Sequence, residues 1–65
     1  MNLDRLKEIR KDQKLSQENI ARALDISLRS YQMKEKGSNS FTFDEVIKIA
    51  NALNMGEIEF IREIL

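Results

Sequence analysis

Five side chains that can contact a partner form a stripe between residues 28 and 36. Its members, at the spacing i, i+1, i+4, i+5, i+8, are Leu28, Arg29, Gln32, Met33 and Lys36. On a helix this spacing places all five on one face. The same segment offers only Tyr31 as a large residue that can pack inward. A helix with so little to bury presents its other face to a partner, and the residue types there allow directional hydrogen bonds beside apolar contacts.

The chain lacks the residues on which most enzyme chemistry depends. Histidine and cysteine are both absent, which removes disulfides, thiolate nucleophiles, Cys/His zinc sites and imidazole acid–base catalysis. The sequence has no nucleophile–base pair, no cluster of metal ligands and no glycine-rich loop. A chain of this size also encloses no usual ligand pocket. We therefore expect no enzyme activity, no catalytic residues, no metal and no cofactor.

Length and composition bound the architecture. The 65 residues are too few for two independent cores, so we expect a single domain over residues 1–65. Apolar residues never run longer than two in a row, whereas a membrane span needs about 20, so we expect a soluble, intracellular protein. Residues 1–40 carry nine Lys/Arg against six Asp/Glu, and residues 41–65 carry two against five. A basic half can meet phosphates, but an imbalance of this size also arises by chance.

Helix starts are marked by hydrophobic staples, in which an apolar residue before the N-cap packs on another one turn inside the helix. The five predicted N-caps are Asn2, Ser16, Ser27, Thr42 and Gly56. The apolar pairs around them are Met1/Leu6, Leu15/Ile20, Ile26/Tyr31, Phe41/Val46 and Met55/Phe60. Thr42 also has Glu45 three residues later, which completes a capping box. The pattern predicts an all-α fold with helices at about residues 3–13, 17–24, 28–36, 43–53 and 57–65.

Helical spacing predicts which faces of these helices are buried. The expected core residues are Leu3, Leu6, Ile9, Ile20, Ala21, Leu24, Val46, Ile49, Ala50, Leu53, Ile58 and Ile61. Gly37 is expected to end the segment 28–36 in a left-handed conformation, and a polar loop, Ser38 to Ser40, follows it.

The segment from Ser16 to Gly37 has a pattern of caps, small residues and turn residues. It comprises Ser16-Gln17-Glu18-Asn19-Ile20-Ala21, Leu24-Asp25-Ile26-Ser27, Tyr31 and Glu35-Lys36-Gly37. This joint spacing resembles the helix-turn-helix of the Cro/repressor (XRE-like) family of phage and bacterial regulators, and the likeness covers about residues 3–61. The resemblance implies a compact five-helix, lambda-repressor-like DNA-binding domain whose helix-turn-helix spans about residues 16–37.

The resemblance also implies roles for individual residues. In this family the second helix of the motif lies in the major groove of DNA, so the base-reading residues would be Leu28, Arg29, Gln32 and Met33. The phosphate-contacting residues would be Gln17, Ser27, Lys36, Ser38 and Asn39. Arg10 and Glu35 occupy the positions of a structural ion pair in the family.

Two residues depart from the family's pattern. Asp25 stands where the turn usually has glycine, and aspartate tolerates the left-handed conformation only at a cost in stability. Lys34 stands where a large apolar residue is common. We expect the stem of Lys34 to lie over the edge of the core with its ammonium in solvent.

Two functional hypotheses follow from these features. The first is a sequence-specific transcriptional regulator of double-stranded DNA, a phage-like repressor or Cro-like protein in the cytoplasm of a bacterial or phage-infected cell. The second is a protein-binding antirepressor or antitoxin-like module of the same fold, which would bind another regulatory protein; the net charge of zero favours it. Taken singly, Arg29, Lys34 and Lys36 are also typical of solvated surface charges, so the first hypothesis depends on the whole constellation.

The last predicted helix carries more apolar residues than one side of it can bury. They are Ile58, Phe60, Ile61, Ile64 and Leu65. An unburied remainder predicts a homodimer that is weak when free and firm on DNA, with this helix docked on its mate. In the alternative, Phe60 folds inward, Ile64 and Leu65 fray, and the protein is a monomer.

Overall fold

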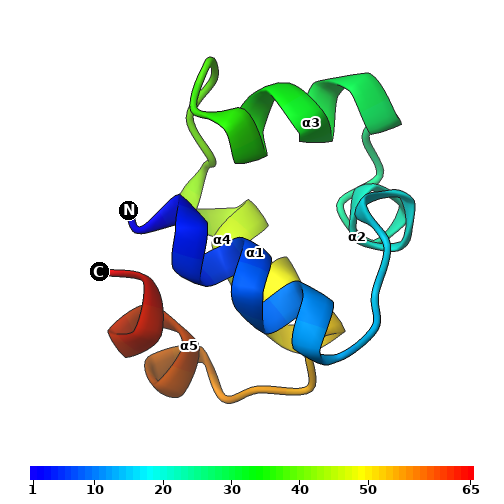
Figure 1. Cartoon of the computed structure of the whole chain (residues 1–65). Helices are drawn as coiled ribbons and strands as arrows, with labels where there is room; N and C mark the ends of the chain where they lie inside the picture. Colours follow the sequence, from blue (N-terminus) through cyan, green and yellow to red (C-terminus); the bar gives the residue numbers. More distant parts are fainter.

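Five α-helices make up the computed structural model, which describes all residues from Met1 to Leu65 (Figure 1). The helices are α1 (Leu3–Asp12), α2 (Gln17–Ala23), α3 (Leu28–Lys36), α4 (Phe43–Ala52) and α5 (Glu57–Ile64). No residue lies in a strand. Each predicted helix is present, with ends within one residue of the prediction, so the all-α prediction is confirmed.

Each helix begins at the residue predicted to cap it. In four of them the cap's side-chain oxygen accepts a hydrogen bond from the backbone N–H three residues later, at 3.0 to 3.1 Å; these caps are Asn2, Ser16, Ser27 and Thr42. Thr42 and Glu45 form the predicted capping box, with the Thr42 N–H donating to Glu45 Oε1 at 2.8 Å. A second capping box was not predicted: Asn19 Oδ1 accepts from the Ser16 N–H at 2.9 Å. At α5 the cap Gly56 has no side chain, and Glu59 accepts from its N–H at 3.3 Å.

Four of the helices end in a left-handed residue. Gly37 has φ of 99°, whereas Lys14, Asp25 and Asn54 have φ of 59°, 58° and 55°. The left-handed conformations predicted for Gly37 and Asp25 are therefore confirmed, and those of Lys14 and Asn54 were not predicted. After each non-glycine residue, the N–H of an apolar residue reaches back to a carbonyl of the preceding helix: Leu15 to Arg10, Ile26 to Ala21 and Met55 to Ala50. This hydrogen bond completes a Schellman motif.

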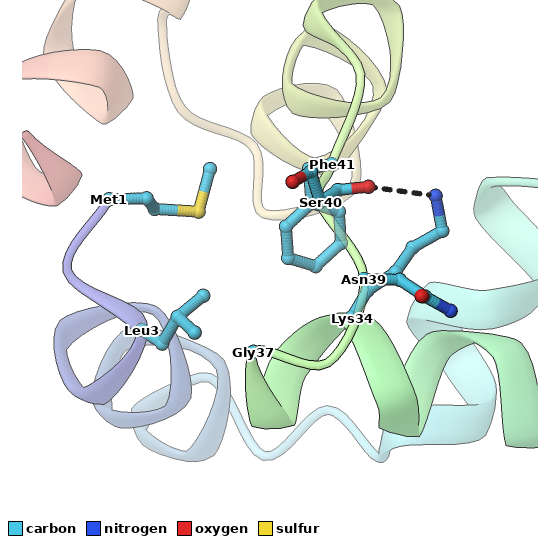
Figure 2. A pocket seen from close by; sticks show the side chains of 7 residues that line it. All are labelled: Met1, Leu3, Lys34, Gly37, Asn39, Ser40 and Phe41. Atoms are coloured by element: carbon cyan, nitrogen blue, oxygen red, sulfur yellow. Dashed lines mark hydrogen bonds between the residues drawn. The ribbon is translucent and has the colours of Figure 1, made fainter.

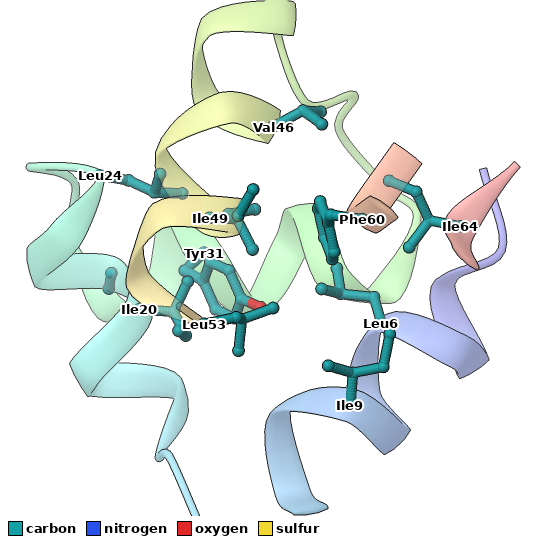
Figure 3. Close-up of a cluster of buried hydrophobic side chains, with 12 residues drawn as sticks. Leu6, Ile9, Ile20, Leu24, Tyr31, Val46, Ile49, Leu53, Phe60 and Ile64 are labelled. Atoms are coloured by element: carbon teal, nitrogen blue, oxygen red, sulfur yellow. The ribbon is translucent and has the colours of Figure 1, made fainter. Parts of the chain in front are cut away.

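The core is one cluster of twelve buried side chains drawn from all five helices (Figure 3). They are Leu6, Ile9, Ile20, Ala21, Leu24, Tyr31, Val46, Ile49, Ala50, Leu53, Phe60 and Ile64. Leu3, predicted to be buried, is partly buried at the edge of this cluster.

The core position predicted for Ile58 on α5 was wrong. Ile58 is 69% exposed and Ile61 is only partly buried, whereas Phe60 and Ile64 are buried in the core. Ile58 lies about 160° around the helix axis from Phe60, so the two cannot face the same core. Because the Phe60 ring is the largest apolar group on α5, it takes the inward position, where it is fully buried.

The helices are arranged so that α3 has an open side. It packs against α2 and α1, while α5 packs against α1 and α4. Helices α3 and α5 make no contact with each other and lie at opposite sides of the molecule (Figure 1). None of the five helices has the length and apolar content needed to cross a membrane.

The left-handed Asp25 yields a stability prediction. Replacing it with glycine removes the steric cost of φ 58° in the folded state, and this gain should exceed the loss from the greater freedom of the unfolded chain. We therefore expect Asp25→Gly to raise the free energy of unfolding by about 0.5–1 kcal/mol. Thermal and urea denaturation measure the change. The control is Gly37→Ala, which should lower the free energy of unfolding. An alanine there would have to adopt φ of 99°, and its Cβ would lie 3.3 Å from Leu3 Cδ1. A clear loss of stability in Asp25→Gly would contradict this account.

Candidate nucleic-acid interface

The outward stripe of α3 (Leu28, Arg29, Gln32, Met33 and Lys36) is exposed along its whole length. Its two apolar members, Leu28 and Met33, are 40% and 36% exposed. On the inward side of the helix Tyr31 and Glu35 are fully buried. A shallow hollow of about 280 Å³ lies along the stripe and is lined by Arg29, Gln32, Met33, Lys36 and Ser38. The face is thus a mixed polar and apolar surface on an anchored helix.

Helices α2 and α3 meet through the short turn from Leu24 to Ser27. Ala21 on α2 is 1% exposed, Ile26 in the turn is partly buried against the core, and the Ile26 N–H donates to the Ala21 carbonyl at 3.0 Å. A larger side chain at Ala21 would push the helices apart, since interaxial distance depends on side chains at the contact. The two residues set the angle at which α3 leaves α2.

The Glu35 carboxylate is the centre of a buried polar network, which we call the Glu35 network (Arg10, Gln17, Tyr31 and Glu35). Arg10 donates from Nε to Oε2 at 3.0 Å and from Nη2 to Oε1 at 3.1 Å. Gln17 Nε2 donates to Oε1 at 2.9 Å, and the Tyr31 hydroxyl donates to Oε2 at 2.5 Å. Arg10 Nη1 also donates to the Leu15 carbonyl at 2.9 Å. Residues of α1, α2 and α3 therefore meet at one carboxylate.

These hydrogen bonds keep the carboxylate ionised in the interior. Burial alone would raise the pKa of Glu35, but the hydrogen bonds from Arg10, Tyr31 and Gln17 outweigh burial and lower it. Burial and the adjacent Glu35 carboxylate both raise the pKa of Tyr31, so its hydroxyl stays a donor. No buried polar side-chain atom lacks a hydrogen-bond partner. The network therefore fixes the position of α3 and leaves none of its buried polar atoms without a hydrogen bond.

Sequence reasoning identified the Arg10 and Glu35 pair but missed the two other members of the network. Gln17, expected at a phosphate, is half-buried; its Nε2 donates to Glu35 and its Oε1 accepts from Gln32 Nε2 at 3.2 Å. For Tyr31 the spacing i, i+4 to Glu35 was an available signal, since such residues lie on one helix face. The Gln17 contact crosses between helices and has no sequence signal.

The other predicted phosphate contacts lie at the two ends of α3, and all are exposed. Ser27 caps the N-terminus of α3, where its Oγ accepts from the Ser30 N–H at 3.0 Å. Lys36, Ser38 and Asn39 lie at the C-terminal end and in the loop that follows. The N-terminus of α3 and the exposed Lys36 ammonium thus lie at the two ends of the outward stripe, an arrangement that suits two stretches of backbone phosphate.

The ammonium of Lys34 is not in solvent, so that expectation was wrong. Its Nζ forms an ion pair with Glu45 Oε1 at 2.7 Å and donates to the Ser40 carbonyl at 3.2 Å, and both side chains are nearly buried. It also lies 5.9 Å from the centre of the Phe41 ring. Figure 2 shows the stem of Lys34 reaching back over the loop to Ser40. Because Glu45 is also the capping-box partner of Thr42, its carboxylate attracts the ammonium inward and ties α3 to the start of α4.

Comparison with known families decides the class of the chain. Residues 6–60 match the model of a family described as Helix-turn-helix. The chain belongs to this family. It is the Cro/repressor-like (XRE-like) family that the sequence resembles. Helix-turn-helix domains of this kind bind DNA, belong in general to transcription regulators and are typically non-enzymatic. Comparisons with curated proteins and with solved structures find no match.

The network of this helix-turn-helix domain predicts an inverted pH dependence. Arg10→Met leaves the buried Glu35 charge without its main partner, so we expect a loss of about 3–5 kcal/mol in the free energy of unfolding. In the wild type the pKa of Glu35 is lowered. The contribution of Glu35 to the free energy of unfolding is therefore lost only as the pH falls below the pKa of an unfolded glutamate, about 4.3. In the variant, burial should raise the pKa of Glu35. Its stability should then increase between about pH 7 and about pH 5, where the wild type changes little.

Urea denaturation followed by circular dichroism at both pH values measures this difference. The control is Arg22→Met, which removes an exposed ion pair with Glu18 and should cost about 0–1 kcal/mol without altering the pH profile. A small loss in Arg10→Met with no gain at the lower pH would show that Glu35 is not held by Arg10.

Proposed function

We propose that this helix-turn-helix domain is a sequence-specific transcriptional regulator, a phage-like repressor or Cro-like protein, that inserts α3 into the major groove. Residues 1–65 would act as one DNA-binding domain in the cytoplasm of a bacterial or phage-infected cell. The observation that carries the proposal is the exposed outward stripe on a helix whose other side is anchored by Tyr31 and Glu35. On this stripe Leu28 and Met33 stand beside Arg29 and Gln32, a mixture of apolar and hydrogen-bonding groups that suits the methyl groups and base edges of the major groove.

The four proposed base-reading residues differ in chemistry. Arg29 presents a fork of donors that matches O6 and N7 of guanine, and Gln32 can pair with N6 and N7 of adenine. Leu28 and Met33 can contact thymine methyl groups. The face therefore predicts a half-site with a G·C pair at the position contacted by Arg29 and A·T pairs at the positions contacted by Leu28, Gln32 and Met33.

Phosphate contacts would position the domain without reading sequence. Ser27 at the start of α3, and Lys36, Ser38 and Asn39 at its end, would contact the backbone on the two sides of the groove. Gln17 reaches the same surface but has both ends of its amide engaged, so at most one of its N–H groups is left for a phosphate.

We further propose that the protein pairs as a homodimer through an apolar hollow on the side away from α3. The hollow, of about 290 Å³, is lined only by apolar residues: Met1, Phe43, Val46, Ile61, Ile64 and Leu65. Of the interface residues predicted on α5, Phe60 and Ile64 are 0% and 3% exposed, so they support the surface from within. Ile58, Ile61 and Leu65 remain to contact a partner, because Ile58 and Leu65 are 69% and 87% exposed.

The base-reading proposal is tested by Arg29→Ala. Loss of a bidentate contact should weaken specific binding by about 1–3 kcal/mol and relax the preference at one base pair. A gel-shift series on DNA that flanks the protein's own gene measures both effects. The control is Lys48→Ala, which removes an exposed cation of α4 that belongs neither to the outward stripe nor to the residues proposed for pairing, and it should leave affinity and preference unchanged. Unaltered binding by a folded Arg29→Ala protein would remove Arg29 from the reading surface.

The dimer proposal is tested by sedimentation at high micromolar concentration, followed by titration with a palindromic duplex. We expect a weak dimer in free solution and two protomers on each duplex, with half-sites about 34 Å apart. Leu65→Asp, at a residue that lines the hollow, should abolish the free dimer and leave the thermal midpoint nearly unchanged, because Leu65 is 87% exposed and contributes little to the core. A monomer throughout, with one protomer on each duplex, would refute this arrangement. It would leave the apolar hollow to another regulatory protein.

A further inference from the structure

Gln17 connects the buried carboxylate of Glu35 to a side chain on the reading surface. Its Nε2 donates to Glu35 Oε1 at 2.9 Å, and its Oε1 accepts from Gln32 Nε2 at 3.2 Å. Glu35 is 1% exposed and Gln32 is exposed. The two hydrogen bonds therefore form a continuous path from the interior to the outward stripe, through α2.

The direction of both hydrogen bonds follows from the chemistry of Glu35. An ionised carboxylate only accepts hydrogen bonds, and both oxygens of Glu35 already accept from Arg10. Gln17 must therefore turn its NH2 group inward and its carbonyl oxygen outward. That oxygen is an acceptor, so the Gln32 amide that faces it must present its own NH2 group. Each amide orientation is determined by the group before it.

We propose that Glu35, acting through Gln17, sets the donor–acceptor orientation of Gln32, so that Gln17 and Glu35 are positioning residues for base reading. The inference rests on the proposed function. An exposed glutamine can rotate its amide by 180° and exchange donor for acceptor. A glutamine held by Gln17 keeps one N–H engaged and offers the other N–H and Oε1 outward in one arrangement.

This fixed orientation has a consequence for discrimination between base pairs. Adenine offers an N7 acceptor beside an N6 donor, so an amide that reads it must place its N–H and its oxygen in one order. An amide free to rotate would pair with other donor and acceptor arrangements nearly as well. Holding the amide before binding also removes side-chain freedom that would otherwise be lost on the DNA.

The test uses Gln17→Met, which keeps the length of the side chain and removes both amide groups. Affinities are measured for duplexes that carry each of the four base pairs at every half-site position. At the position read by Gln32, the ratio of affinities for the preferred base pair and for the other pairs should fall about three- to tenfold in the variant. At the other positions this ratio should be unchanged. Gln32→Met should remove discrimination at the same position, and the double variant should lose no more than Gln32→Met alone. Gln13→Met, at an exposed glutamine outside the network, is the matched control.

A second measurement needs no DNA. In the free protein the side-chain amide resonances of Gln32 should shift in Gln17→Met and remain in place in Gln13→Met, with both variants folded by circular dichroism. Unchanged Gln32 resonances would overturn the inference. So would an equal loss of affinity for every duplex, since that result would make Gln17 a phosphate contact only.

The two proposals fail differently. A wild-type protein without any sequence preference overturns the proposed function, and this inference with it. A wild-type preference that Gln17→Met leaves intact overturns the inference alone.

Discussion

The position of α3 depends on one buried carboxylate. Glu35 is 1% exposed and accepts four hydrogen bonds, which come from α1, from α2 and from α3 itself. Ion pairs of this kind add little net stability, because desolvation offsets most of the attraction, but removing one partner is costly. Their effect here is geometric. Since Glu35 and Tyr31 anchor α3 from the inside, the helix needs no apolar stripe of its own, and its outer face is free for polar and apolar contacts with DNA.

The remainder of the fold supplies the frame for this network through one repeated connection. Three times, a helix ends in a left-handed residue that is followed by an apolar residue and then by the N-cap of the next helix. The apolar residue, which is Leu15, Ile26 or Met55, closes one helix by its backbone N–H and packs against the core as the staple of the next. Such short connections fix the angles between helices and so bring Arg10, Gln17 and Glu35 within reach of one another.

Local chemistry explains why so much of this structure could be predicted from the sequence. The caps and the left-handed Asp25 and Gly37 depend on residues within one helical turn, and these predictions were correct. Of the apolar residues predicted to precede the caps, four pack against the core, whereas Met1 is exposed. The errors involve groups distant in sequence. The rotation of α5 depends on how the Phe60 ring fits between α1 and α4, the burial of the Lys34 ammonium depends on Glu45, and the engagement of Gln17 depends on Glu35. Spacing along one helix carries no information about such partners.

The central claim is that the outward stripe of α3 contacts DNA. Titration of ¹⁵N-labelled protein with duplex DNA that flanks its own gene, followed by NMR chemical shifts, tests it most directly. The account predicts that the largest shifts fall on the outward stripe and on the residues at the two ends of α3, with much smaller shifts at α4. Large shifts confined to α4 and α5, with the outward stripe unchanged, would contradict it.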